Sequence, residues 1–448
     1  MKKFDKNKYL TKLRYRKWLR SYVKYFYICI PCLICLVLGI YFTYSKFFVS
    51  SEEDVVRTTV GEFIYGDVVL SYTLDGETGT STFPKQNTGV EGTSVVCDNE
   101  ATATWDNSLW SIKMTNMGNG SRVKCKVAFK TQETKTISGI TFNLNTFSPD
   151  FSKSACSDCE SKEAGVFAAE DDYGTSYYYR GSVENNYVNF AGMTWRIIRI
   201  NGDGSVRIIL NDTAGTSAFN NSGDDNAYVG YMYGTPGSST YEETHKNTND
   251  SVLKKNIDNW YESNLKNSYN DYLSDTGFCN DRNPATKNSK IGTGKEITYY
   301  SGYLRIVSSE PSLKCSQAND LFTTTSSAIG NKSLKYPIAT ITADEIMLDG
   351  SGGGVFNGDF NRVEKGNSYL NIGKTFRTMT PAGNYYPFGD GYMYAINFGY
   401  YLNGNLDDYS VNLLGDFSIG VRPVINLKAD AIKYGTGTSS NPYRITEN

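Results

Sequence analysis

The chain has 448 residues with 45 Lys or Arg and 47 Asp or Glu, so its net charge is only −2. Residues 1–46 hold eleven basic residues and one acid, which leaves 34 basic and 46 acidic residues, a net charge of −12, in the remainder. Because nucleic-acid binding needs concentrated Lys and Arg, this acidic remainder argues against nucleic acid as a partner. The 35 Tyr and 42 Gly indicate β-rich domains instead, since aromatic residues fit pleated sheets and Gly serves turns.

The N-terminal segment predicts a cytoplasmic tail followed by a membrane anchor. Residues 1–24 carry ten basic residues and one acid, and residues 25–44 form an apolar run without charge. Twenty such residues are enough for a helix to cross a bilayer. Short flanks rich in Lys and Arg stay in the cytoplasm. We therefore predict a single-pass protein of the cell membrane, with its N-terminus cytoplasmic and its C-terminus extracellular.

A cleaved signal peptide is the alternative for this segment. The apolar run is longer than the usual signal-peptide core, and residues 45–51 contain no clear small-x-small cleavage site. These two features favour an anchor that is retained. The cysteines within the run are interpreted as apolar filler, although a thiol at this depth is also a site for acylation; they are Cys29, Cys32 and Cys35.

Six cysteines follow the apolar run, an even number in a compartment where disulfides form. Their spacing along the chain groups them as local pairs. We predict one disulfide between Cys97 and Cys125 and a second between Cys279 and Cys315. Each is expected to stabilise the fold by about 2–4 kcal/mol, because it restricts the unfolded chain.

The remaining pair, Cys156 and Cys159, forms a CxxC motif in a polar stretch. A zinc site would need further ligands, but the chain has no second CxxC and a single histidine, His245. A thioredoxin-like redox role would need a βαβ context. We interpret the motif as a small structural or idle disulfide.

Residues 58–130 predict a small β-sandwich that acts as a spacer, because short alternating strands are separated by turn residues. Trp105 and Trp110 are expected to fill its core. Residues 131–164 are polar and poorly periodic, which predicts a linker.

Residues 165–448 predict an α+β domain. Two β runs, residues 193–200 and 205–210, are joined by Asn-Gly-Asp-Gly, which is typical of a hairpin. Further along, Asp250 or Ser251 precedes apolar residues at helical spacing, which predicts a helix.

A second, short helix is predicted from a capping box. Thr342 is followed three residues later by Glu345, and glycines from residue 350 onward end the helix. Asp344 and Glu345 are not expected to act together as acid and base, since adjacent helical residues point in different directions. Arg422, within an apolar run near the C-terminus, is expected to lock packing or bind a loop carbonyl.

No catalytic, cofactor-binding or metal-ligating residue is predicted. Residues 220–226 offer oxygen ligands for calcium but lack EF-hand spacing, so we interpret them as a solvated loop. A Ser-His-Asp or Cys-His site would depend on His245, which lies in a polar stretch typical of loop surface. Paired carboxylates for glycoside cleavage stay open, because the sequence does not give their separation in space.

Several segments resemble a family of uncharacterised membrane-anchored surface proteins of low-GC Gram-positive bacteria: residues 171–177, 195–204, 277–281, 336–345, 378–381 and 421–427. Residues 96–99 and 104–107 resemble the N-terminal module of that family. The resemblance covers nearly the whole chain beyond the apolar run. It implies a location and an architecture rather than an activity.

The capped Thr-Ala-Asp-Glu helix, together with the Arg-Pro-Val strand, is also similar to the C-type-lectin-like fold of sulfatase-modifying (formylglycine-generating) domains. Those enzymes hold copper with cysteines of their C-terminal region. This chain has no cysteine after Cys315, so neither that activity nor its cofactor is expected.

The expected architecture is thus a transmembrane helix, a small β-sandwich and a C-type-lectin-like α+β domain. The predicted function is ligand binding or adhesion through residues 165–448, with a glycan, a peptide or a host surface as the ligand. Two alternatives are kept: a cell-wall-acting hydrolase and a structural component of the envelope or an appendage.

Overall fold

The computed structural model describes residues 11, 14–18, 57–58, 67–79, 82–85, 89–107, 109–119, 122–146, 148–152, 155, 164–221, 225–285, 291–351, 368–384, 393–400, 406–413 and 419–447. The predicted anchor at residues 25–44, with Cys29, Cys32 and Cys35, lies outside these residues, as do Cys156 and Cys159. Among the helices in the described part of the chain, none is both long and apolar enough to span a bilayer.

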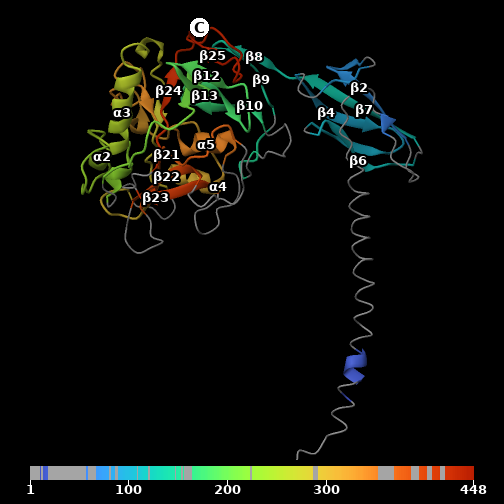
Figure 1. Cartoon of the computed structure of the whole chain (residues 1–448), viewed down its shortest axis with the longest axis horizontal. Helices are drawn as coiled ribbons and strands as arrows, with labels where there is room; N and C mark the ends of the chain where they lie inside the picture. Colours follow the sequence, from blue (N-terminus) through green and yellow to red (C-terminus); the bar gives the residue numbers. More distant parts are fainter. Residues whose placement is uncertain are drawn as a thin grey trace, which may run out of the picture. The chain divides into compact units, whose positions relative to one another are not determined.

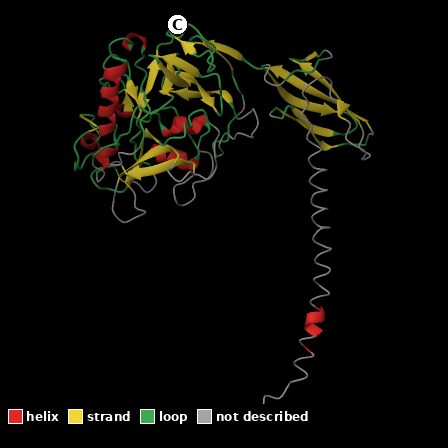
Figure 2. Ribbon diagram, viewed as in Figure 1, coloured by secondary structure: helices red, strands yellow, loops and turns green. Residues whose placement is uncertain are grey.

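The chain divides into two compact units, residues 1–131 and residues 132–448. Strands outnumber helices among the described elements, and the helices lie in the second unit apart from a short N-terminal piece (Figure 2). The protein therefore belongs to the mixed α and β class that its sequence predicts.

The first unit contains a five-stranded sheet and a separate hairpin. In the sheet, β2 pairs with β7 in parallel and β4 pairs with β7 antiparallel. The sheet strands are β1 (Arg57–Thr58), β2 (Asp67–Leu74), β3 (Glu77–Thr78), β4 (Val90–Cys97) and β7 (Arg122–Thr131). The hairpin strands are β5 (Thr102–Asp106) and β6 (Ser111–Asn116).

Aromatic side chains fill the interior of the first unit. Phe129 of β7 is almost fully buried, and its ring centroid lies 5.2 Å from that of Trp105 and 5.3 Å from that of Trp110. The core role predicted for both tryptophans is therefore confirmed. The predicted disulfide between Cys97 and Cys125 is also present, and it joins residues that face each other across β4 and β7.

The second unit begins with a hairpin, β8 (Thr134–Ile137) and β9 (Ile140–Asn143), inside the segment predicted to be a linker, residues 131–164. Ile140 and Phe142 project from the same face of β9 and are buried in the core of the second unit. Part of the predicted linker is therefore a structural element. The alternation that produces it covers only four residues, which is too short to stand out in a polar stretch.

An eight-stranded sheet forms the centre of the second unit, with the order β10-β11-β13-β14-β24-β20 and with β12 and β25 at its side (Figure 1). The hairpin predicted near residue 200 is confirmed as β13 and β14. The strands are β10 (Gly165–Asp171), β11 (Gly174–Arg180), β12 (Tyr187–Phe190), β13 (Met193–Ile200), β14 (Val206–Leu210), β20 (Ile338–Ala339), β24 (Val424–Leu427) and β25 (Tyr443–Arg444).

A second, four-stranded sheet pairs its strands in the order β18-β21-β22-β23. Its strands are β18 (Thr298–Tyr299), β21 (Phe376–Asn384), β22 (Met393–Tyr400) and β23 (Leu406–Leu413). The α-helices of this unit are α2 (Tyr241–Thr244), α3 (Val252–Asn264), α4 (Ser301–Ser308) and α5 (Ala343–Asp349). Ser251 caps α3 by accepting a hydrogen bond from the Lys254 N–H, as its sequence position predicts.

Short elements complete the second unit. Two-residue strands form two further pairs, β15 (Met232–Tyr233) with β16 (Asn249–Asp250) and β17 (Phe278–Cys279) with β19 (Leu321–Phe322). Single 3₁₀ turns are η2 (Asn226–Val229), η3 (Asn270–Tyr272) and η4 (Ala318–Asp320).

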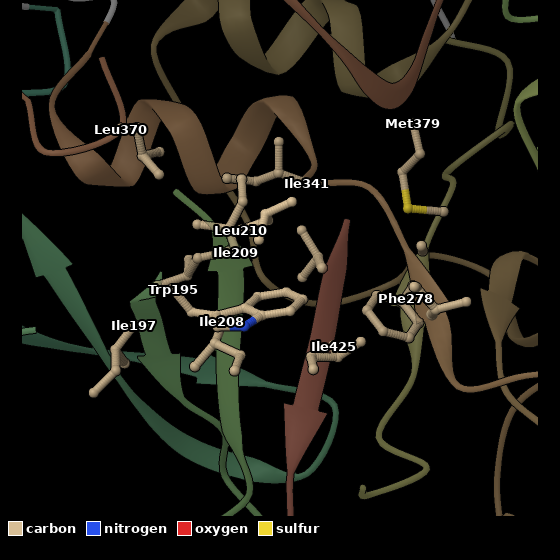
Figure 3. Packing of buried hydrophobic residues seen from close by; sticks show 14 of the residues in the cluster. Trp195, Ile197, Ile208, Ile209, Leu210, Phe278, Ile341, Leu370, Met379 and Ile425 are labelled. Atoms are coloured by element: carbon tan, nitrogen blue, oxygen red, sulfur yellow. The ribbon is translucent and has the colours of Figure 1, made fainter. Parts of the chain in front are cut away.

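The main core lies between the eight-stranded sheet and the segments that cover it (Figure 3). Trp195 and Ile208, from neighbouring strands of the sheet, pack with Ile425 of β24, and each is fully buried. Burial of one such side chain contributes about 1.5–3 kcal/mol to folding. This core fixes β13, β14 and α5, which carry the charged residues described next.

Candidate functional site

The predicted capping box is present at the start of α5. Thr342 Oγ1 accepts a hydrogen bond from the Glu345 N–H at 3.1 Å, and Glu345 Oε2 accepts one from the Thr342 N–H at 3.1 Å. This arrangement satisfies two N–H groups that a helix start leaves without partners. It also fixes the Glu345 side chain, so that the second carboxylate oxygen points away from the cap.

That second oxygen, Glu345 Oε1, lies between two buried arginines. It accepts hydrogen bonds from Arg207 Nη1 at 2.7 Å and from Arg199 Nε at 3.1 Å. The two arginines are direct cross-strand neighbours on β13 and β14, an arrangement of like charges that is unfavourable by itself. Glu345 supplies the negative charge that makes the pairing possible. Burial alone would raise the pKa of Glu345, but the charges of Arg207 and Arg199 outweigh burial and hold it at about 2.

Arg199 also bonds to a second carboxylate, at the end of β10. Its Nη1 donates to Asp171 Oδ2 at 2.5 Å and to Ser176 Oγ at 3.2 Å. Asp171 Oδ2 accepts a further hydrogen bond from the Gly202 N–H at 3.0 Å. The β10–β11 and β13–β14 turns are thereby tied together.

A separate, partly buried ion pair joins α4 to α5. Arg305 binds both oxygens of Asp344, through Nε at 2.7 Å and Nη2 at 2.8 Å, and its Nη1 donates to Asp281 Oδ2 at 2.5 Å. Asp281 has a left-handed backbone conformation, with φ of 46°, which is uncommon for a residue with a side chain. Asp344 and Glu345 therefore bind different arginines, in agreement with the expectation that they do not act as a pair.

These ion pairs line a small cleft. The space in which the centre of a water molecule fits measures about 20 Å³, enough for one or two water-sized groups. The other side chains that matter at its wall are Asp172, Tyr173 and Lys314, together with the disulfide residue Cys279. The cleft thus draws on parts of the chain from residue 171 to residue 380.

Asp172 is the carboxylate of the cleft with the most free accepting capacity. It is half-buried, and both of its oxygens lie 3.1 Å from the Cys315 backbone nitrogen. Within the described residues, no arginine donates a hydrogen bond to it. Burial raises its pKa above the ordinary value, against the opposing effect of the hydrogen bond from the Cys315 N–H. Beside it, the Tyr173 hydroxyl accepts from the Gly277 N–H at 2.8 Å, which leaves the hydroxyl proton available to a ligand.

The predicted disulfide between Cys279 and Cys315 is present and lies at this cleft. It closes a loop with a sequence separation of 36 residues. Because the Cys315 N–H binds Asp172, the disulfide also fixes the position of that carboxylate.

His245 was expected at a loop surface, but the structure shows that it is buried, with 1% of its surface exposed. Its ring stacks on Tyr241 at 4.1 Å between centroids, and its Nδ1 lies 3.0 Å from the Tyr241 carbonyl oxygen. Burial and the nearby Arg282 charge lower the pKa of His245 to about 3. The imidazole is therefore neutral at physiological pH and belongs to the interior.

The calcium alternative considered for residues 220–226 falls partly outside the described residues, which exclude residues 222–224. Asp225 caps η2 by accepting from the Ala227 N–H at 2.9 Å and also accepts from the Gly237 N–H at 2.7 Å. Its oxygens are thus bound to backbone. Across the part of the chain that the structure describes, no group of three or more His, Cys, Asp or Glu residues is arranged to hold a metal ion.

Sequence reasoning identified Glu345 as a cap but missed the charges around it. Arg199 and Arg207 each lie within a run of isoleucines, and an arginine in such a strand is itself a signal of a buried ion pair. Their partners are 28 to 146 residues away along the chain, so local spacing does not identify them.

Comparison with known proteins adds no relative: neither a protein-family model, nor a curated protein, nor a solved structure matches this chain.

Proposed function

We propose that this chain is a cell-surface protein whose second unit binds a ligand at the charged cleft. The observation that carries the proposal is the cleft itself, where buried ion pairs hold the walls in place and Asp172 keeps accepting capacity. Pre-formed polar groups that converge on a small cleft are typical of binding sites. The arginines of the cleft already donate hydrogen bonds to Glu345, Asp171 and Asp344, whereas Asp172 keeps free accepting capacity.

The free accepting capacity of Asp172 defines the chemistry of the ligand. A partner for Asp172 has to donate hydrogen bonds, which hydroxyl and amino groups do. The cleft admits one or two such groups, so the rest of the ligand lies over the mouth, near the exposed Lys314. A glycan, a peptide or a host-surface molecule carries groups of this kind.

The proposed location is the outer face of a cell membrane, with residues 25–44 as a single anchor and the N-terminal basic tail in the cytoplasm. The charge pattern of the first 46 residues supports this topology. The disulfides at Cys97–Cys125 and Cys279–Cys315 are in keeping with an oxidising compartment. Protease added to intact cells should digest both units and spare the tail, and digestion of the tail alone would contradict the topology.

We also propose that the first unit is a β-sandwich spacer and that the second has a C-type-lectin-like fold, similar to that of the sulfatase-modifying (formylglycine-generating) domains that parts of its sequence resemble. In the first unit, side chains of the sheet and the hairpin share two apolar clusters. In the second, the capped helix α5 and strand β24 both contribute to the main core. A fold of this kind supports binding by analogy only, so the cleft carries the functional argument.

A binding experiment tests the function. The full-length chain should bind members of a panel of glycans and peptidoglycan fragments without changing them. Absence of binding on every panel would contradict the proposal, and release of cleaved fragments would establish the hydrolase alternative instead.

A further inference from the structure

A second group of buried polar side chains lies at the last residue of α5, whereas the cleft acids lie in its first turn. Asp349 is 1% exposed, and its Oδ2 accepts hydrogen bonds from the hydroxyl groups of Ser351, at 2.5 Å, and Ser368. Its other oxygen, Oδ1, is buried and has no hydrogen-bond partner among the residues that the structure describes. One side of this carboxylate is therefore satisfied and the other is not.

The Tyr369 hydroxyl is a second buried group that has no hydrogen-bond partner in the described part of the chain. The backbone places it close to Asp349: the Gly181 N–H donates to the Asp349 carbonyl, and the Tyr369 N–H donates to the Gly181 carbonyl. Tyr369 is 6% exposed, so water outside the protein does not satisfy its hydroxyl.

The third group is the Arg422 guanidinium, which is fully buried. Its Nε donates to the Leu210 carbonyl at 2.8 Å and its Nη1 to the Leu370 carbonyl at 2.7 Å, as expected for an arginine that locks loops. Its Nη2 has no hydrogen-bond partner within the described ranges of the chain. Since Leu370 follows Tyr369 directly, Arg422 reaches the same part of the interior.

Electrostatic interactions agree with this proximity. Burial raises the pKa of Tyr369 well above its usual value, the Asp349 charge raises it further, and the Arg422 charge lowers it. Burial lowers the pKa of Arg422 to about 9, and the charges of Tyr369 and Asp349 act in the opposite direction. Each of the three groups thus interacts with the other two.

The hydrogen-bonding roles of the three atoms complement one another. Arg422 Nη2 donates, the Tyr369 hydroxyl does either, and Asp349 Oδ1 accepts when the carboxyl group is ionised or donates when it is protonated. Leaving such groups buried without partners forfeits the hydrogen bonds that they make in the unfolded chain. Buried water typically makes about three hydrogen bonds to groups of this kind. Water both donates and accepts, so it satisfies the three atoms in either protonation state of Asp349, whereas an anion would face a negative charge whenever Asp349 is ionised.

We infer that the second unit holds one internal water molecule that bridges Asp349 Oδ1, the Tyr369 hydroxyl and Arg422 Nη2. This water secures the C-terminal end of α5 against two other segments of the chain. The same helix carries Asp344 and Glu345 at its other end, so the internal site supports the position of the cleft acids. The inference concerns the interior and does not depend on the proposed ligand.

Replacing Tyr369 by Phe tests the water bridge in the full-length chain. If the bridge is present, the substitution should lower the stability of the second unit; if it is absent, the substitution should leave the stability unchanged or raise it. If the hydroxyl binds the water, Tyr369→Phe should raise the unfolding equilibrium constant of the second unit by about fivefold, the worth of one hydrogen bond. If the hydroxyl has no partner, its removal should leave the protein equally or more stable, and this result would overturn the inference.

Tyr179→Phe is the matched control. The Tyr179 hydroxyl is also buried without a hydrogen-bond partner among the described residues, and the charge that acts on its pKa is that of Tyr443 rather than those of an acid and an arginine. Its removal should not increase unfolding.

A crystal structure of the full-length chain, grown with bromide, gives an independent measurement. A single peak without anomalous signal, within hydrogen-bond distance of all three atoms, is expected. Either a bromide peak or an empty position would overturn the inference.

Discussion

The two compact units of the chain stabilise their interiors by different means. In the first unit, Phe129 of β7 packs against aromatic rings, and the disulfide between Cys97 and Cys125 links β7 to β4. In the second unit, Glu345 is buried with two arginines in addition to a large apolar core. Buried charges cost desolvation energy that apolar side chains do not, so they are weak evidence for stability. The comparison indicates that the second unit keeps its charges for the shape and polarity of the cleft.

The largest expected effect comes from breaking the buried network. Glu345→Gln leaves Arg199 and Arg207 close together without a full negative charge, which should lower the free energy of unfolding of the second unit by about 3–5 kcal/mol. Denaturant unfolding of the full-length chain measures this loss of unfolding free energy. Lys374→Ala is the control, because Lys374 pairs with Asp212 at the exposed surface and its loss should cost at most about 1 kcal/mol. If the two variants lowered the free energy of unfolding equally, the buried charges of the second unit would contribute no more to its stability than an ion pair at its surface.

A comparable effect is expected in the first unit from its aromatic core. Phe129→Ala deletes a ring that contacts two tryptophans and should cost about 3–5 kcal/mol. The loss should appear in the unfolding of the first unit, followed by tryptophan fluorescence. A variant that left this transition unchanged would mean that the aromatic cluster does not hold the unit together.

A pH-dependent effect, smaller within any one pH unit, is expected at Asp349. Burial raises its pKa to about 7, against the opposing interactions with Ser351, Ser368 and Arg180. Because the folded state then binds a proton that the unfolded state has lost, stability should fall as pH rises from about 4 to about 7, by at most about 1.4 kcal/mol per pH unit.

Asp349→Asn should remove that dependence, measured as the difference in unfolding free energy between pH 5 and pH 8. Asp212→Asn, an exposed position, should retain it. If the wild type and Asp349→Asn changed equally with pH, the carboxyl group would not be protonated in the folded protein.

Much of the fold follows from local sequence patterns. The hairpin of β13 and β14 follows from two apolar runs around Asn-Gly-Asp-Gly, and the cap of α5 from the three-residue spacing of Thr342 and Glu345. Both features depend on residues that are neighbours in the sequence. The two confirmed disulfides also join cysteines that are close along the chain.

Local sequence patterns did not predict the cleft, because its residues come from distant parts of the chain. Glu345 meets Arg207 across 138 residues, and nothing local distinguishes it from other acids. His245 was misjudged in the same way, because its polar neighbours in sequence say nothing of the Tyr241 ring that covers it. Where segments from distant parts of the chain converge, packing decides exposure, and packing is not a local property.

We propose that the second unit binds its ligand through Asp172, and a comparison of binding by three forms of the chain tests this role. The full-length wild type, Asp172→Asn and Asp212→Asn are titrated with the same panel of glycans and peptidoglycan fragments. Asn keeps the size of Asp172 and an oxygen for the Cys315 N–H but removes the charge, so affinity should fall about tenfold or more, whereas Asp212→Asn should bind as the wild type does. Unchanged binding by Asp172→Asn would contradict the claim.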